Sequence, residues 1–268
     1  MSSRIAVLAS VLTSLLPSAL AHDLWLEADS FRVAGPGEMV LVRAGNGTIY
    51  ERSENAVAPG RIARLILLGP GGAAVDPPTP EVQGDWLHLA FTPQAAGTYW
   101  LALATRPNLI RLTGEEFTEY LLHDGIPAVL KQREQDGISG RDEVEQYSKY
   151  VKALLQVGST SPGDCSRPVG LEIEIVPLEN PYRLKPGDTL PVRVLFRGTP
   201  LSGLTLHAGS AGQTGKPFQV DTDDSGEARI PLSHPGRWYI RGIHLFPVEA
   251  PDHSYESYWA ALTFEVGA

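Results

Sequence analysis

Two stretches near the start of the chain recur near its end, and this internal repeat constrains the fold more than any other feature. Residues 31–40 (FRVAGPGEMV) resemble residues 182–190 (YRLKPGDTL) with one residue dropped, and residues 97–101 (GTYWL) resemble residues 236–240 (GRWYI). A repeat of this kind indicates two related units rather than one large barrel. The glycine-x-aromatic opening suits a strand whose first aromatic side chain packs at the corner of a sandwich.

Turn residues and alternating apolar positions indicate that both units consist of strands. The 27 Gly and 22 Pro in 268 residues predict many turns. Short alternating runs occur through residues 24–110 and again after residue 170, and strands at this spacing predict sandwiches. We therefore expect a mainly β protein of two immunoglobulin-like β-sandwich domains with a helical insertion between them. The expected boundaries are 22–112 for the N-terminal domain, 113–158 for the insertion, 159–169 for a loop and 170–268 for the C-terminal domain.

The spacing of apolar residues changes in the insertion. Residues 113–116 (TGEE) have the form of a capping box, which marks the beginning of a helix. Residues 126–135 fit a second helical segment, because Pro127 is tolerated in a first turn. Residues 142–157 show the strongest helical pattern, and Gly158 follows as a stop signal. The sequence therefore predicts that this last helix packs its apolar stripe against a sandwich.

The first 21 residues have the three parts of a secretion signal. Arg4 supplies the positive charge, residues 5–16 form a short apolar segment, and residues 19–21 (ALA) have the small-x-small form of a cleavage site. No other apolar run approaches 18 residues, so we expect nothing else to span a membrane. The sequence thus predicts a signal peptide at 1–21 and a soluble, exported periplasmic protein.

Cleavage after Ala21 makes His22 the first residue of the mature chain, which changes its chemistry. A free α-amino group and the imidazole Nδ1 of the same residue can close a chelate ring on a metal, and nitrogen donors suit Cu, Ni and Zn. A third donor, usually a second imidazole, completes a histidine brace. The alternatives are a chance histidine at the cut site, or a cut one residue away that leaves no chelate.

The candidate second imidazole is His244. It has the strand parity of Trp238 and Ile240, on the predicted inner face, and lies toward the end where a sandwich opens to its loops. A site shared with His22 lies between the domains and brings the two rings to within about 5 Å of each other. The alternative is a core histidine that is satisfied by a backbone carbonyl.

Other polar residues could add to the site or lie apart from it. Asp23 and His253 are further candidate metal ligands, and Glu256 could orient a ring from outside the ligand shell. We expect His207 to be exposed, because it lies opposite the leucine-rich face of its strand. Cys165, the only cysteine, is expected in a loop as an incidental thiol, with a soft metal ligand or an intermolecular bridge as alternatives.

Charge and motifs argue against several function classes. Arg4 is the only charged residue before His22, so the rest of the chain has 21 Lys and Arg against 31 Asp and Glu. The sequence contains no basic patch of the kind that binds nucleic acid. Neither Ser210 nor Ser225 forms the Gly-x-Ser-x-Gly motif of a nucleophile elbow. These motifs assign no catalytic group, so a binding protein is favoured over an enzyme, although an enzyme is not excluded.

Seven short motifs resemble those of one family. They are residues 22–27 (HDLWLE), 114–120 (GEEFTEY), 147–152 (YSKYVK), 177–182 (PLENPY), 185–188 (KPGD), 237–244 (RWYIRGIH) and 256–260 (ESYWA). The family is the NikM-like exported family associated with nickel and cobalt uptake, long catalogued as a domain of unknown function, and the resemblance covers nearly the whole mature chain. It implies a periplasmic, metal-linked, two-domain β protein in which His22 and His244 match motif positions and His253 falls in a variable loop.

The leading hypothesis is a periplasmic transition-metal-binding protein that acts as a carrier, buffer or accessory factor in nickel, cobalt or copper uptake. Nitrogen ligands favour Cu(II) by raw affinity, whereas the resemblance favours nickel or cobalt. A membrane transporter component is a candidate partner, since this chain lacks the membrane segments of a permease. Two alternatives remain: a metal-independent immunoglobulin-like interaction module, and a copper histidine-brace enzyme that activates oxygen.

Overall fold

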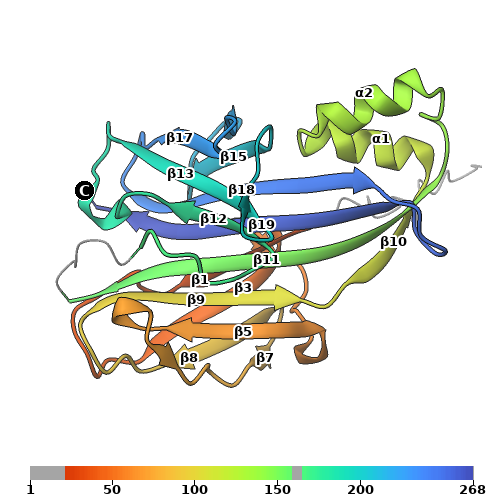
Figure 1. The fold of residues 1–268 in the computed structure, drawn as a ribbon. Coiled ribbons are helices and arrows are strands. Elements are labelled where there is room, and N and C mark those ends of the chain that lie inside the picture. Colours follow the sequence, from red (N-terminus) through yellow and green to blue (C-terminus); the bar gives the residue numbers. More distant parts are fainter. Residues whose placement is uncertain (1–21, 159–164, 268) are drawn as a thin grey trace, which may run out of the picture.

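The computed structural model describes residues 22–158 and 165–267, so the signal peptide predicted at 1–21 lies outside the described residues. The described chain forms one long sheet, two smaller sheets and a pair of short α-helices (Figure 1). None of the helices in these residues is long and apolar enough to cross a membrane.

The long sheet runs through the whole molecule. Its strands, in spatial order, are β16 (Phe218–Asp221), β15 (Thr205–Ser210), β18 (Gly236–Pro247), β19 (Tyr255–Val266), β11 (Glu143–Val157), β9 (Gly97–Thr105), β5 (Ile62–Leu68) and β6 (Ala74–Val75). Two more strands, β10 (Asn108–Leu112) and β2 (Arg32–Val33), pair with β11. Strand β11 is parallel to β19 and antiparallel to β9, so it joins the two halves of the sheet.

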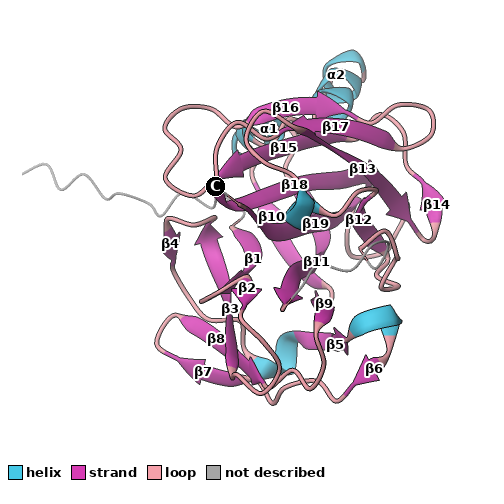
Figure 2. Ribbon diagram, turned by 90° about the vertical axis from the view of Figure 1, so that its left-hand side faces the viewer, coloured by secondary structure: helices cyan, strands magenta, loops and turns pink. Residues whose placement is uncertain are grey.

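The two smaller sheets come from opposite halves of the sequence (Figure 2). The first contains β1 (Asp23–Ala28), β3 (Val40–Thr48), β8 (Trp86–Phe91), β7 (Glu81–Gln83) and β4 (Arg52–Ser53). The second contains β12 (Ile173–Pro177), β13 (Thr189–Phe196), β14 (Thr199–Pro200) and β17 (Glu227–Pro231). Short 3₁₀ turns lie at η1 (Pro59–Arg61), η2 (Pro70–Gly72) and η3 (Pro181–Arg183).

The two smaller sheets contact opposite faces of the long sheet. Thr263 of β19 donates a hydrogen bond to the carbonyl of Leu26 in β1, at 2.7 Å. On neighbouring β11, the side chain of Lys152 forms an ion pair of 2.6 Å with Glu174 of β12. Thr263 is directly opposite Ala153 in the β11–β19 register, so alternation places Lys152 on the other face. Each smaller sheet thus forms a sandwich with the long one, and the chain is mainly β and immunoglobulin-like.

The helix predicted over residues 142–157 is wrong: these residues form β11, the longest strand. Every residue from 148 to 157 is buried, because this central strand is covered on both faces. A strand buried on both sides carries apolar residues without strict alternation, and some of them then fall at helical spacing by chance. The pattern was therefore not specific to a helix.

The other two helices are confirmed. Helix α1 (Gly114–His123) begins with the predicted capping box, in which Thr113 and Glu116 each accept a hydrogen bond from the other's backbone N–H. Helix α2 (Pro127–Gln135) has its proline in the first turn. The helices bury Phe117, Tyr120, Leu121 and Val129 against Ile243, Leu245, Tyr255 and Trp259 of β18 and β19. This packing forms a second, smaller core at one end of the long sheet.

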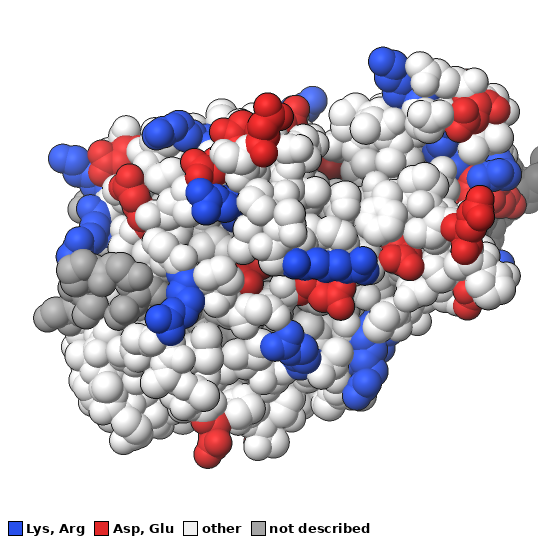
Figure 3. Space-filling model, in the orientation of Figure 1, with Lys and Arg blue, Asp and Glu red and all other residues white. Residues whose placement is uncertain are grey.

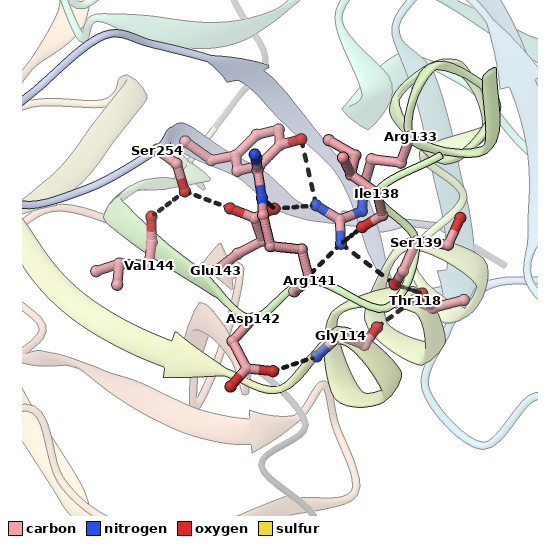
Figure 4. A network of polar contacts seen from close by, with 11 residues as sticks. Gly114, Thr118, Arg133, Ile138, Ser139, Arg141, Asp142, Glu143, Val144 and Ser254 are labelled. Carbon is pink, nitrogen blue, oxygen red and sulfur yellow. Dashed lines mark hydrogen bonds and ion pairs between the residues drawn. The ribbon is translucent and has the colours of Figure 1, made fainter. Parts of the chain in front are cut away.

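A buried arginine anchors the helical pair to the sheet (Figure 4). Arg133 of α2 is in hydrogen-bond contact with Glu143 at the beginning of β11, and donates to the carbonyls of Ile138 and Arg141 at 3.0 and 2.9 Å. Ser254, in the loop before β19, donates to the same glutamate. This network fixes α2 to two strands of the long sheet through a single guanidinium group.

Candidate functional site

His22 lies directly before β1, beside the hairpin formed by β3 and β4. Asp23 is opposite Gly47 in the β1–β3 ladder, and Gly47 is opposite Ser53 in the β3–β4 ladder. This register places Glu54 next to the first described residue. The Nε2 atom of His22 lies 3.3 Å from Oε2 of Glu54, and both side chains are partly exposed. A histidine–carboxylate pair therefore stands at the predicted mature N-terminus.

A buried lysine holds the backbone of His22. The Nζ of Lys149 on β11 donates to the carbonyl of His22 and, at 3.0 Å, to Oδ1 of Asn46 on β3. It also lies 5.5 Å from the ring centroid of Trp259. Burial lowers the pKa of Lys149 to about 8. The main chain of His22 is thus fixed from the long sheet, while Glu54 contacts its ring from the first small sheet.

The contact with Glu54 leaves the other ring nitrogen of His22 available. Nδ1 has no hydrogen bond within the described residues, and it is the ring nitrogen nearer to the residue's own backbone nitrogen. Metal-bound histidines usually donate their second N–H to a carboxylate or carbonyl, which fixes the tautomer and the ring orientation. His22 has a carboxylate beside its Nε2 atom, so its residue types and contacts fit a nitrogen chelate.

Asp23 is held by an arginine rather than by the candidate site. Its Oδ2 lies 3.3 Å from Nε of Arg241, whose Nη1 lies 2.9 Å from Oδ1 of Asp124. Burial raises the pKa of Asp23, against the opposing effect of Arg241. A carboxylate engaged in this way must leave its ion pair before it can bind a metal.

The structure does not bring His22 and His244 together. Arg241 of β18 contacts Asp23, and strand alternation places residues 241 and 244 on opposite faces of the sheet. The imidazole of His244 packs instead against Phe196 and Phe246, with ring centroids 4.7 and 4.9 Å away. Burial, and then Arg197, lower its pKa. Within the described residues no group of three or more His, Cys, Asp and Glu side chains is arranged to hold a metal.

His253 lies in a separate polar cluster in the loop between β18 and β19. Its Nδ1 lies 2.8 Å from Oδ1 of Asp252, and its Nε2 lies 3.6 Å from Oε1 of Glu256. The side-chain amide of Gln146 is 3.2 Å from the ring. Glu256 therefore lies beside a histidine, but that histidine is His253 rather than His22.

His207 differs from its predicted surroundings, whereas Cys165 lies outside any helix or strand, as predicted. His207, expected at the surface, is 3% exposed, because the turn between α1 and α2 covers its strand and brings Gly125 against the ring. Burial, reinforced by Arg241, lowers the pKa of His207 to about 4. Cys165 is buried, with its Sγ 3.9 Å from Oγ of Ser166, while residues 159–164 of the predicted loop lie outside the described residues.

A polar cavity of about 400 Å³ opens beside Asp23. The side chains of Tyr50 and Tyr239 line it, with ring centroids 6.1 Å apart, and Asp23, Glu51 and Arg241 contribute charge. Tyr50 has a φ of 60°, a conformation that costs free energy for a bulky residue. The carboxylates of Asp23 and Glu51 suit the approach of a cation to this part of the surface.

Glu54 and Lys149 make the closest contacts to His22, and neither was predicted as a site residue. Neither belongs to a local motif, and each reaches His22 only through strand pairing. The clustered glycines and asparagine of residues 45–48 (GNGT) were the available signal, since they mark the irregular end of β3 beside which β4 and Glu54 fold back. Register, however, cannot be read from that segment alone.

Taken together, these features define a mainly β protein of immunoglobulin-like sandwiches that carries a histidine–carboxylate pair at the beginning of its first strand. The chain belongs to the family described as "Domain of unknown function (DUF4198)", whose model matches residues 19–245. No curated protein matches the chain.

Several solved structures are similar over most of the chain. The D0-D1 domain of intimin is 12% identical, with 92% of this chain and 98% of that chain covered and a TM-score of 0.23. FdeC, a broadly conserved Escherichia coli adhesin, is 14% identical, with 93% and 65% covered and a TM-score of 0.23. The Bacillus anthracis TIE protein is 13% identical, with 92% and 38% covered and a TM-score of 0.18. Scores of this size carry no argument about function.

Proposed function

We propose that this protein is exported to the periplasm and binds a divalent transition metal ion, nickel, cobalt or copper, at its mature N-terminus. His22 supplies two donors, its α-amino nitrogen and its Nδ1. The protein then serves as a carrier, buffer or accessory factor in metal uptake. The observation that supports this most directly is the 3.3 Å contact between Nε2 of His22 and Glu54.

This contact matters because it occupies the ring nitrogen that the chelate does not use. Glu54 lies on the Nε2 side of the ring, which leaves Nδ1 for the metal ion, and metal-bound histidines commonly have a carboxylate partner at the other nitrogen. Lys149 donates to the carbonyl of the same residue, which restrains the main chain beside the donors. An oriented pair of donors loses less conformational freedom when it binds an ion.

A two-nitrogen chelate leaves further coordination positions to water or to donors from another protein. Such a site suits a metal ion that is cargo, since a receiving partner can supply ligands while His22 still holds the ion. The resemblance to NikM-like proteins supports nickel or cobalt and a membrane transporter component as the partner. The order of divalent metal affinities supports copper.

The experiment compares three proteins that differ only at the N-terminus. One begins at His22, one begins at His22 with an acetylated α-amine, and one has His22→Ala. The acetylated protein keeps every side chain but converts the α-amine into an amide. Titration with Cu(II), Ni(II), Co(II) and Zn(II) is expected to show at least one metal bound more than tenfold tighter by the first protein than by the other two. Equal affinities for all four metals contradict the proposal.

A second variant tests the role of Glu54. Glu54→Gln keeps the size of the side chain but removes the carboxylate, and loss of such a partner typically weakens metal affinity about 10- to 100-fold. Glu134→Gln, at an exposed residue of α2, is the matched control and is expected to bind like the unaltered protein. Unchanged affinity in Glu54→Gln contradicts the orienting role, and the acetylated protein then tests the chelate by itself.

A further inference from the structure

Strand β18 has an unpaired edge along its last residues. It pairs with β19 from Gly236 to Pro247, but with β15 only from Trp238 to Gly242. Residues 243–247 therefore have no partner strand on the β15 side. At about 3.3 Å per residue, this edge is roughly 16 Å long.

The edge is free because β15 turns away from it. The backbone N–H of Leu204 donates to Oγ1 of Thr222 at 2.9 Å, and the N–H of Thr222 donates to the carbonyl of Leu204 at 3.0 Å. The N–H of Gly203 donates to the carbonyl of Thr222 at 2.9 Å. Gly203 has a φ of 70°, which a glycine adopts without strain. These bonds hold the chain before β15 beside the end of β16 and away from β18.

The hydrogen-bonding groups at the edge can be assigned from the ladder. The carbonyl of Arg237 accepts from the N–H of Ala211, so the odd-numbered residues of β18 point their backbone groups toward β15. Leu245 is the first odd-numbered residue wholly beyond the ladder, and it is 5% exposed. Its N–H and C=O therefore face the β15 side of β18, where no strand among the described residues pairs with them. Free groups of this kind on a strand edge can pair with an added strand.

A cleft of about 500 Å³ lies directly along this edge. One wall is the turn and first residues of α2, including Ile126, Pro127 and Val129, and the opposite wall includes Leu204. Charged side chains contribute only one lysine and one aspartate to the lining, so the walls are mainly apolar. Figure 3 shows a hollow between the helices and the sandwich, above a largely uncharged surface.

We propose that this cleft binds an extended apolar segment of a partner protein, which adds to β18 as a short strand in the place that β15 leaves. An N–H and C=O pair on one residue is matched by the corresponding pair on a residue of an antiparallel strand. The apolar walls favour Val, Ile, Leu or Phe in that segment. Pro247 has no N–H and limits how far pairing can continue, so the segment is about four or five residues long.

Peptide selection tests this directly. Hexapeptides randomised at all six positions and displayed on phage are selected against the mature protein. Two variants serve as counter-targets: Ala128→Trp, at an exposed position that lines the cleft, and Gln135→Trp, on the same helix but outside the cleft lining. We expect apolar peptides that bind the mature protein and Gln135→Trp alike, and Ala128→Trp at least tenfold more weakly.

Two measurements on the selected peptides separate strand addition from other modes. N-methylation at alternate residues keeps the side chains but removes the ladder donors, and is expected to weaken binding at least tenfold. Amide hydrogen exchange at Leu245 is expected to slow when the peptide binds. The proposal is overturned if no selected peptide binds the mature protein more tightly than it binds the Ala128→Trp variant. It is also overturned if binding is unchanged both when the odd-numbered and when the even-numbered peptide residues are N-methylated. Self-association of the mature protein that Ala128→Trp abolishes also overturns it, because the occupant is then a second copy.

Discussion

The carboxyl group of Glu145 on β11 is expected to make the protein less stable as the pH rises through neutrality. Glu145 is 2% exposed and lies beneath helix α1. It accepts hydrogen bonds from the hydroxyls of Ser257 and, at 3.4 Å, Tyr120. Burial raises its pKa from 4.5 to about 7. The folded protein therefore holds this proton at pH values where the unfolded chain has already lost it.

The sign of the effect follows from this difference. The pKa of Glu145 is higher in the folded protein than in the unfolded chain. Its favourable contribution to the free energy of unfolding is therefore complete below about pH 4.5 and is lost as the pH rises through about 7. At 1.36 kcal/mol per pKa unit, the loss is about 3 kcal/mol. Glu145→Gln has no charge to bury and keeps an oxygen acceptor for both hydroxyls. The variant is therefore expected to be more stable than the unaltered protein at pH 8, by about 1–3 kcal/mol.

Urea unfolding followed by tryptophan fluorescence at pH 5, 6, 7 and 8 measures this difference. The free-energy advantage of Glu145→Gln is expected to be smallest at pH 5, to grow most between pH 5 and 7, and to level off by pH 8. Glu134→Gln, at an exposed residue of α2, serves as the control and should follow the unaltered protein at every pH. If the difference between Glu145→Gln and the unaltered protein does not change with pH, the reasoning is refuted.

Three further substitutions test other parts of the structure by urea unfolding at pH 7. Arg133→Met removes the buried one of the two arginines that pair with Glu143 and is expected to cost about 3–5 kcal/mol, with partial recovery in the double variant Arg133→Met/Glu143→Gln. Lys152→Met isolates Glu174 in the same way and is expected to cost a similar amount, about 3–5 kcal/mol, whereas an equal loss in Lys152→Met/Glu174→Gln contradicts the pairing argument. Thr113→Ala removes the helix cap of α1 and is expected to cost about 1 kcal/mol, and no change means that the cap contributes nothing.

Local sequence signals predicted much of the fold. The capping box at Thr113 and the proline at residue 127 located both helices, because these signals act within a single turn. The stretch forming β11 was misread, since a strand buried on both faces shows no alternation that distinguishes it from a helix. These residues form a strand because the rest of the protein covers both of their faces, and local sequence does not reveal that burial.

At the candidate site, too, local sequence identified individual residues but not the neighbours that the fold brings to them. The small-x-small motif before His22 identified the residue, but Glu54 and Lys149 reach it through strand register, which local sequence does not specify. For His244, parity correctly matched it to the face of Trp238. Parity cannot say which neighbouring sheet covers that face, and β1 lies on the other one.

The chelate at the mature N-terminus is tested most directly by electron paramagnetic resonance of the Cu(II)-loaded protein. Two samples are compared, one beginning at His22 with a free α-amine and one in which that α-amine is acetylated. The predicted spectrum of the first shows coupling of copper to two nitrogens of His22, confirmed when only histidine carries ¹⁵N, and the second sample loses the amine coupling. Identical spectra from the two samples contradict the account, because copper then binds elsewhere and the pairing of His22 with Glu54 has another purpose.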